Sequence, residues 1–140
     1  MENKTAFVSG HMTITEEEFG IHYIPVLNRA MEDNDLIIMG DCSGTDTITM
    51  KYLKSKGYKK VIVFHMLNKA RNNHGFNTMP GFTNDNQRDS AMTDASDYDI
   101  AWVRPGRKGS GTDQNLERRN NPDNTYIQDC KQKNHKITKK

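Results

Sequence analysis

Three short segments rich in small and hydroxyl residues carry the groups that could bind an anionic ligand. The first comprises Ser9, Gly10 and His11; the second comprises Gly40, Asp41, Cys42, Ser43, Gly44, Thr45 and Asp46; the third comprises Gly109, Ser110, Gly111 and Thr112. Glycine allows the backbone to approach a ligand closely, and the N–H groups at a helix start attract anions. A phosphorylated small molecule is therefore the expected ligand.

No single one of these segments is a known phosphate-binding fingerprint. The second lacks the lysine of a P-loop, and the chain contains no G-x-G-x-x-G pattern. Each segment, however, follows a predicted strand and precedes a predicted helix. In an open α/β sheet the carboxyl ends of the strands share one edge, where ligands bind. We therefore expect one shared site, and the prediction rests on the set of three.

Several carboxylates could act on a bound ligand. A carboxylate near a reacting carbon can act as nucleophile or as base for water. Asp41, at the end of the second strand, is the best-placed candidate, with Asp46 and Asp89 behind it. Each also has a structural interpretation, because Asp46 can cap a helix, Asp89 can sit in a first turn, and Asp41 can bind a ribose hydroxyl. For Asp41 we favour ligand contact over catalysis.

The other reactive side chains carry weaker signals. Cys42 could be an activated thiol, but a role as a small filler residue explains it better because no histidine partner is evident. Cys42 and Cys130 make no disulfide framework, and the histidines show no metal-ligand spacing. We expect no metal and no cofactor. Arg104 and Arg107 have two interpretations, as solvated charges of a loop or as phosphate contacts, and the sequence does not choose between them.

Four mostly apolar runs predict the strands that position these groups. They are Thr5–Gly10, Asp35–Asp41, Lys60–Met66 and the shorter Asp97–Val103. Continuous apolarity rich in β-branched residues is typical of strands covered on both faces. Helix patterns lie between the runs, and this alternation predicts a single Rossmann-like, doubly wound α/β domain with a mainly parallel sheet of four or five strands. Asn124–Asp129 is a candidate fifth strand, although a plain turn fits there too.

The helix boundaries carry their own signals. Thr15 followed by Glu18 has the spacing of a capping box. Pro25 is tolerated in a first turn, where its missing N–H would be unpaired anyway. Gly57 is a C-cap candidate. The segment from Gly111 onward predicts the last helix.

Two parts of the chain fall outside this alternation. Residues 68–86 are rich in Asn and Gly and too long for an ordinary connection, so we weigh a lid or edge loop over a site equally with a disordered insertion. The expected organisation is one ligand-binding α/β domain over residues 1–119, followed by a weakly structured extension with a basic tail over residues 120–140.

Length and charge limit the function classes. A chain of 140 residues suits one domain. The net charge of +2, from 20 basic and 18 acidic residues, implies no field for sequence-independent duplex binding, so nucleic acid is not an expected partner. The sequence begins without an apolar signal segment and contains no run that could span a bilayer, which predicts a cytoplasmic protein without a membrane partner.

Three stretches in this order and spacing resemble a known family. They are "VSGHMTIT", "IMGDCSGTDTITMKYLKSKGYKKVIVF" and "NQRDSAMTDASDYDIAWVRPGRKGSGT". Together they resemble the YspA/YpsA-related branch of the SLOG superfamily, a Rossmann-like group that also contains the LOG "lysine decarboxylase" phosphoribohydrolases and the DprA-like proteins. The resemblance covers Thr5 to Leu116.

The resemblance implies a nucleotide or nucleotide-derived ligand. It implies contacts from Ser9, Gly10, Gly40, Gly44, Asp46, Gly109, Gly111 and Thr112. Arg88, four residues before Met92, matches an arginine that works at the ribose-phosphate site of LOG-like enzymes, where a guanidinium fork suits phosphate. Sites in this superfamily are often completed by a second subunit, so a homo-oligomer is expected.

The departures from the family pattern bear on the chemistry. His11 and Met12 replace a glycine and an arginine, and Asp41 and Ser43 stand in "GDCSGTD" where relatives read "GGARGAD". The glutamate of the LOG pattern "PGGxGTxxE" falls at Asn115, and Glu117 would face another side of the helix. These differences argue against LOG-type hydrolysis in its usual form.

Three function hypotheses follow. The leading one is a sensor or sequestering module that binds a nucleotide or a nucleotide-derived small molecule at the carboxyl edge of the sheet. The second is an N-glycosidic hydrolase or transferase acting on nucleoside monophosphates, in which Asp41 and Arg88 would be the catalytic residues. The third is a non-catalytic assembly protein, in which the basic tail binds a partner.

Overall fold

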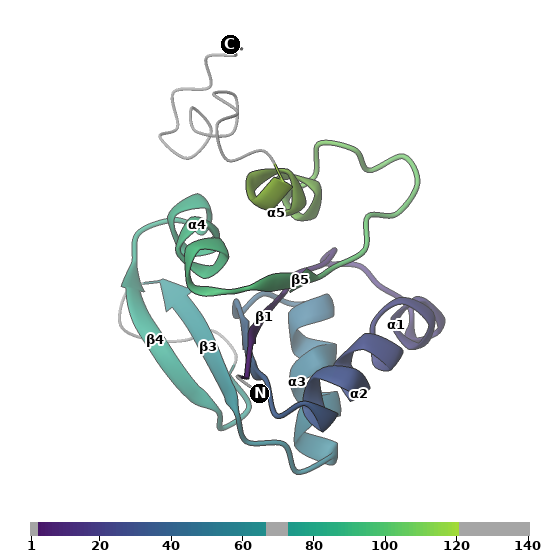
Figure 1. The fold of residues 1–140 in the computed structure, drawn as a ribbon. Helices are drawn as coiled ribbons and strands as arrows, with labels where there is room; N and C mark the ends of the chain where they lie inside the picture. The colour runs from purple at the N-terminus through teal and green to yellow at the C-terminus, as the bar shows by residue number, and fades with distance from the viewer. Residues whose placement is uncertain (1–2, 67–72, 121–140) are drawn as a thin grey trace.

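The strands form one parallel sheet with helices on both faces, as a computed structural model of residues 3–66 and 73–120 shows (Figure 1). The strands are β1 (Thr5–Val8), β2 (Leu36–Met39), β3 (Val61–Met66), β4 (Asn77–Phe82) and β5 (Tyr98–Ile100). The helices are α1 (Glu16–His22), α2 (Ile24–Glu32), α3 (Thr45–Ser55), α4 (Asp85–Ala95) and α5 (Gly111–Asn120). The expected single α/β domain of Rossmann type is confirmed.

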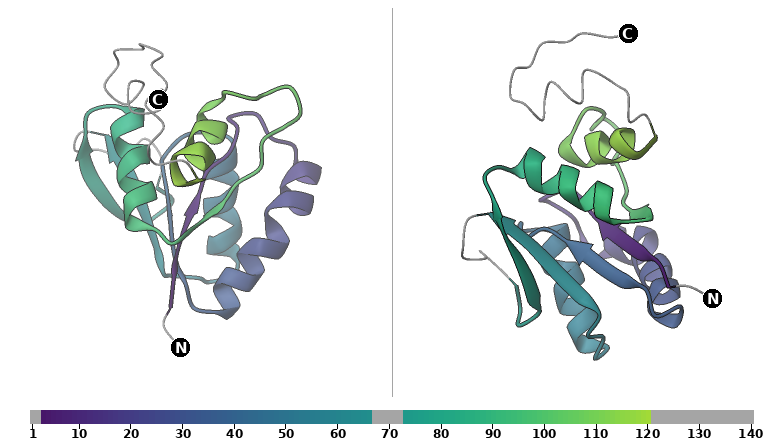
Figure 2. Two further views of the ribbon diagram at one scale, coloured as in Figure 1. Left: turned by 45° about the horizontal axis from the view of Figure 1, so that its top comes forward. Right: turned by 60° about the vertical axis from the view of Figure 1, so that its left-hand side comes forward.

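The strand order is β4-β3-β2-β1-β5, and every pair of neighbours is parallel. The chain therefore runs outward from β1 to β4 on one side and then returns to place β5 on the other side of β1. This reversal is the topological switch point at which open α/β sheets bind ligands. Figure 2 shows β1 and β5 next to each other beneath the last helix.

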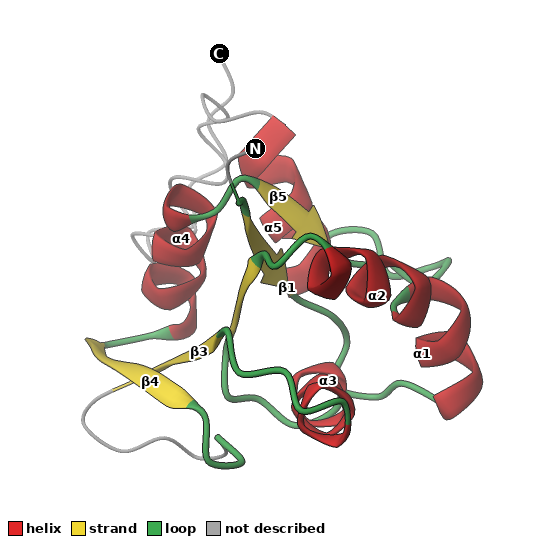
Figure 3. Ribbon diagram, turned by 60° about the horizontal axis from the view of Figure 1, so that its bottom comes forward, coloured by secondary structure: helices red, strands yellow, loops and turns green. Residues whose placement is uncertain are grey.

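Alternating side chains of the strands build a core on each face of the sheet. Ala6 and Val8 pack toward α1, α2 and α3, whereas Phe7 between them packs toward Met92 of α4. This alternation follows from the period of two in a strand. Figure 3 shows α1, α2 and α3 on one side of the sheet and α4 and α5 on the other.

The predicted helix signals are confirmed. The hydroxyl of Thr15 accepts from the backbone N–H of Glu18 at 3.0 Å, and the Glu18 carboxylate accepts from the N–H of Thr15 at 3.0 Å. Pro25 lies in the first turn of α2. The C-cap residue of α3 is Lys56, and Gly57, the predicted cap, follows it directly with a φ of +70°. No helix within the described ranges is long and apolar enough to cross a membrane.

The fifth strand lies in the stretch for which no strand was predicted. β4 occupies Asn77–Phe82, inside the expected loop 68–86, and pairs with β3. It contains Pro80 and Gly81 and is largely exposed, which an edge strand tolerates because one row of its backbone groups needs no partner strand. The other candidate strand, Asn124–Asp129, lies outside the described residues.

Candidate functional site

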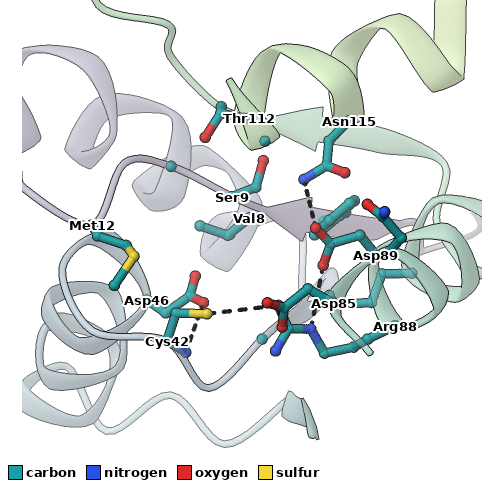
Figure 4. A pocket seen from close by; sticks show the side chains of 16 residues that line it. Val8, Ser9, Met12, Cys42, Asp46, Asp85, Arg88, Asp89, Thr112 and Asn115 are labelled. Carbon is teal, nitrogen blue, oxygen red and sulfur yellow. Dashed lines mark hydrogen bonds and ion pairs between the residues drawn. The ribbon is translucent and has the colours of Figure 1, made fainter. Parts of the chain in front are cut away.

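A cavity of about 190 Å³ lies at the carboxyl edge of the sheet, beside the switch point between β1 and β5 (Figure 4). Its lining comprises Phe7, Val8, Ser9, Gly10, Met12, Gly40, Cys42, Asp46, Asp85, Asn86, Arg88, Asp89, Met92, Gly111, Thr112 and Asn115. All three predicted segments contribute to it, although they are far apart in the sequence. The parallel sheet therefore brings the three segments together at one edge.

The N-termini of three helices meet at this cavity. Asp46 lies in the first turn of α3, Asp85 and Asn86 begin α4, and Gly111 and Thr112 begin α5. The backbone N–H groups of a first turn carry partial positive charge. The cavity thus combines dipoles that favour an anion with carboxylates that favour a hydrogen-bond donor.

Arg88 is the central buried charge of the site, with 3% of its surface exposed. Its Nη1 lies 3.1 Å from Oδ1 of Asp41, its Nε lies 3.3 Å from Oδ1 of Asp89, and its Nη2 lies 3.1 Å from Oδ1 of Asp85. Burial works against the charged guanidinium, but Asp89, Cys42 and Asp85 outweigh that effect and raise the pKa of Arg88. The guanidinium therefore stays charged and orients the surrounding carboxylates.

Gly40 makes room for this guanidinium. A Cβ built on Gly40 would lie 2.9 Å from Cζ of Arg88, which is closer than such atoms approach one another. The glycine that was predicted as a ligand contact thus also has a packing role. It brings the end of β2 against α4.

Asp46 and Asp89 are buried carboxyl groups with unusual acidities. Burial raises the pKa of Asp46 to about 8, and the opposing hydrogen bond to Oδ2 from the Cys42 N–H, at 3.2 Å, does not offset it. Burial also raises the pKa of Asp89, against the influence of Arg88 and Asn115. At neutral pH Asp46 is therefore mostly a neutral acid that can donate a proton to a hydrogen bond.

Asn115 holds Asp89 in place from α5. Its Nδ2 donates to Oδ2 of Asp89 at 3.3 Å, and its Oδ1 accepts from Nη1 of Arg118 at 2.5 Å. The position where the family resemblance places a glutamate is therefore occupied by a buried amide that supports a neighbouring carboxylate. This linkage joins α5 to α4 across the cavity.

Ser9 presents a buried polar group to the cavity. The residue is 8% exposed, and within the described part of the chain its Oγ has no hydrogen-bond partner. Its backbone is fixed, because its N–H donates to the Ile100 carbonyl at 3.1 Å and its carbonyl accepts from the Tyr23 hydroxyl at 2.8 Å. A buried hydroxyl of this kind is expected to find a partner when a ligand binds.

Seven of the predicted ligand-binding residues do not line the cavity. They are His11, Asp41, Ser43, Gly44, Thr45, Gly109 and Ser110. The structure gives several of them supporting roles: the His11 carbonyl accepts from the Thr45 hydroxyl at 2.8 Å, and the Asp41 carboxylate pairs with Arg88. The Gly109 N–H donates to the Asp113 carboxylate at 2.6 Å.

The structure places Arg104 at the first helix rather than at the cavity. Its Nη2 lies 2.8 Å from Oε1 of Glu18 and also donates to the Thr13 carbonyl at 2.6 Å. The hydrogen bond from Arg104 lowers the pKa of Glu18 to about 2. The sequence left two interpretations of Arg104, a solvated loop charge or a phosphate contact. The structure instead shows an arginine that is paired with Glu18 and does not line the cavity.

Sequence reasoning did not propose several lining residues as ligand contacts. Asp85 and Asn86 belong to the first turn of α4, which follows the N-cap residue Asn84. Asn84 is an N-cap residue type, so the sequence contained a signal for the start of this helix. Because a helix that starts at the carboxyl edge of the sheet places its first turn there, this signal could have predicted Asp85 and Asn86 as lining residues. Met12 stands in the first motif stretch where the resembled family has an arginine, but no local pattern predicted that its side chain would line the cavity.

No family model, curated protein or solved structure matches this chain. The SLOG resemblance thus stays a prediction from the three motif stretches. Among residues 3–66 and 73–120, no three His, Cys, Asp or Glu side chains are grouped so that they could hold a metal ion.

In Asp46→Asn, the free energy of unfolding is expected to decrease less between about pH 4 and about pH 8 than it does in the unchanged protein. The folded pKa of Asp46, about 8, lies above its ordinary value of 3.8, so the folded state retains a proton that the unfolded state releases. The stability from this group is therefore fully present below the ordinary pKa and is lost as pH rises through the folded pKa. Urea unfolding across this window measures the slope.

Asp94→Asn provides the control for this substitution, because Asp94 is an exposed carboxylate on α4. It should keep the slope of the unchanged protein. An identical slope for the Asp46 and Asp94 variants would contradict the assignment of the proton to Asp46.

Proposed function

We propose that the cavity binds a nucleotide or a nucleotide-derived small molecule through its sugar-phosphate part, and that the protein acts as a sensor or sequestering module. The observation that carries the proposal is the buried Ser9 hydroxyl without a partner, in a cavity that α5 also enters with Gly111 and Thr112 of its first turn. A phosphate oxygen can accept from that hydroxyl and from N–H groups of the helix terminus.

The carboxyl groups suit the sugar. Asp89 can accept from a ribose hydroxyl, as acidic residues do in other nucleotide sites. Asp46, whose pKa is about 8, is mostly neutral at pH 7 and so adds little repulsion toward a phosphate in the same cavity. The arrangement therefore matches a ligand that carries both hydroxyl groups and an anionic group.

The size of the cavity supports partial enclosure of the ligand. Its volume of about 190 Å³ is below the roughly 300 Å³ at the lower end of sites for drug-sized ligands. A sugar phosphate is smaller than a whole nucleotide. The base of a bound nucleotide would accordingly extend beyond the cavity.

Ser9→Ala tests this proposal. We expect it to weaken the binding of ribonucleoside 5′-monophosphates by about tenfold, the cost of losing one hydrogen bond to a charged group. Isothermal titration calorimetry measures the affinity, after a thermal-shift screen of nucleoside mono- and diphosphates, ADP-ribose and cyclic nucleotides. Stability should change little, because the hydroxyl has no partner without ligand.

Thr93→Val is the matched control, because Thr93 also has a buried hydroxyl without a partner but does not line the cavity. It should bind as the unchanged protein does. A flat thermal-shift response to the whole panel would argue against the proposal and for a non-catalytic assembly protein.

A second candidate function is hydrolysis or transfer at the N-glycosidic bond. The observation that favours it is the pair of buried carboxyl groups with raised pKa values, Asp46 and Asp89, in the lining of one cavity. Asp46 could donate a proton to a leaving base. Asp41, the catalytic candidate from sequence, pairs with Arg88 and does not line the cavity.

Incubation with nucleoside monophosphates tests this activity. Free base detected by chromatography, and lost in Asp46→Asn, would support it. Intact nucleotide after long incubation would exclude it for the compounds tried.

A further inference from the structure

Met12 is a large apolar side chain exposed at the cavity. It is 67% exposed and belongs to the lining. Ile21 and Met79 are the other large apolar side chains that are exposed in the described part of the chain, and neither lines the cavity. Exposure of a single apolar residue is ordinary. Met12 requires an explanation because Phe7, Val8 and Met92, the other large apolar residues of the lining, are buried in the core and Met12 is not.

The backbone at Met12 is held firmly although its side chain is exposed. The preceding His11 carbonyl accepts from both the N–H of Thr45, at 3.1 Å, and the Thr45 hydroxyl, at 2.8 Å. A Cβ built on Gly44 would lie 2.2 Å from the Met12 carbonyl oxygen, so the two backbones are in close contact. The loop after β1 is thereby fixed on the start of α3, which fixes the backbone position from which the Met12 side chain extends.

The cation of the cavity lies away from Met12. Figure 4 shows Met12 on the same side as Cys42 and Asp46, with Arg88 and Asp89 across the cavity. Among the described residues of the lining, Arg88 is the one cation, and Asp41, Asp85 and Asp89 already surround it. A second phosphate beside Met12 would therefore find no cation from the lining.

An aromatic ring is the group that fits this position. A thioether makes favourable contacts with aromatic rings and adapts its shape to them. In the proposed function the cavity holds the sugar phosphate but not the whole nucleotide. The base then lies outside the cavity, where an exposed side chain of the lining can cover it. An apolar, uncharged contact there favours a flat base over a further anionic group.

We infer that Met12 packs against the base of the bound nucleotide and makes the cavity select a ligand with a heteroaromatic base over a bare sugar phosphate. This inference rests on the proposed function. Met12 is a specificity-determining residue in this arrangement, whereas Ser9 and the start of α5 hold the part of the ligand that both compounds share.

Met12→Ala separates the two parts of the ligand. Calorimetric titration of the full chain with AMP and with ribose 5-phosphate should show AMP binding about fivefold weaker in this variant. The affinity for ribose 5-phosphate should stay unchanged. Met12→Leu should retain most of the preference for AMP, because it keeps the apolar volume.

Met79→Ala is the matched control, since it removes the same side chain from an exposed position on β4 outside the cavity. It should leave both affinities unchanged. Equal weakening of AMP and ribose 5-phosphate by Met12→Ala, or no change in either, would overturn the role of Met12 and leave the proposed binding function standing. Absence of binding by the unchanged protein to both compounds would overturn both proposals. A changed oligomeric state with unchanged AMP affinity would identify Met12 as a protein contact instead.

Discussion

Arg88→Met is expected to lower the free energy of unfolding by about 3 to 5 kcal/mol, the cost of removing one partner of a buried ion pair. The Asp41 side chain is 1% exposed and the Arg88 side chain 4% exposed. Without the guanidinium, Asp41 would keep a buried charge that has lost its cation at 3.1 Å. Asp89 would lose the same cation, so the proposed binding of a nucleotide should weaken together with the loss of stability.

A double-mutant cycle with Asp41→Asn measures this coupling. Because an amide carries no charge, Arg88→Met in that background should cost much less than in the unchanged protein. Urea unfolding gives the free energies. Arg29→Met is the control, since Arg29 is exposed on α2, and we expect a change within about 0.5 kcal/mol. Equal costs of Arg88→Met in the two backgrounds would show that the ion pair is not the source of the effect.

Gly44→Ala is expected to destabilise the protein by about 3 kcal/mol, from a strained backbone and an overpacked contact. Gly44 has a φ of +80° and a ψ of −123°, and a Cβ there would lie 2.2 Å from the Met12 carbonyl oxygen. Relief of this contact would displace the loop after β1, so the discrimination between AMP and ribose 5-phosphate should also decrease.

Gly57→Ala separates strain from contact. Gly57 has a φ of +70°, but nothing lies within 4 Å of the Cβ position. The substitution there should cost only about 1 to 2 kcal/mol, the penalty of a left-handed backbone. Thermal unfolding of both variants measures the difference. If Gly44→Ala proves no more costly than Gly57→Ala, the close approach of Met12 to Gly44 does not contribute to stability.

The sequence predicted the elements whose signals are local. Apolar periodicity and capping depend on residues close in the chain. They predicted four strands, the capping box at Thr15 and Glu18, and the end of α3 near Gly57. They did not predict β4. It is an exposed edge strand containing Pro80 and Gly81, and its pairing with β3 replaces the missing apolar pattern.

The candidate site divides in the same way. Sequence alone determined that the three small-residue segments follow strands of one parallel sheet and therefore meet at one edge, since parallel strands share their carboxyl ends. The tertiary structure decided which of their side chains line the cavity: Ser9 does and Ser110 does not. It also decided that Arg88 pairs with Asp41, and that Asn115 supports Asp89. The direction and burial of a loop side chain depend on contacts between distant segments, and no local pattern in the chain encodes them.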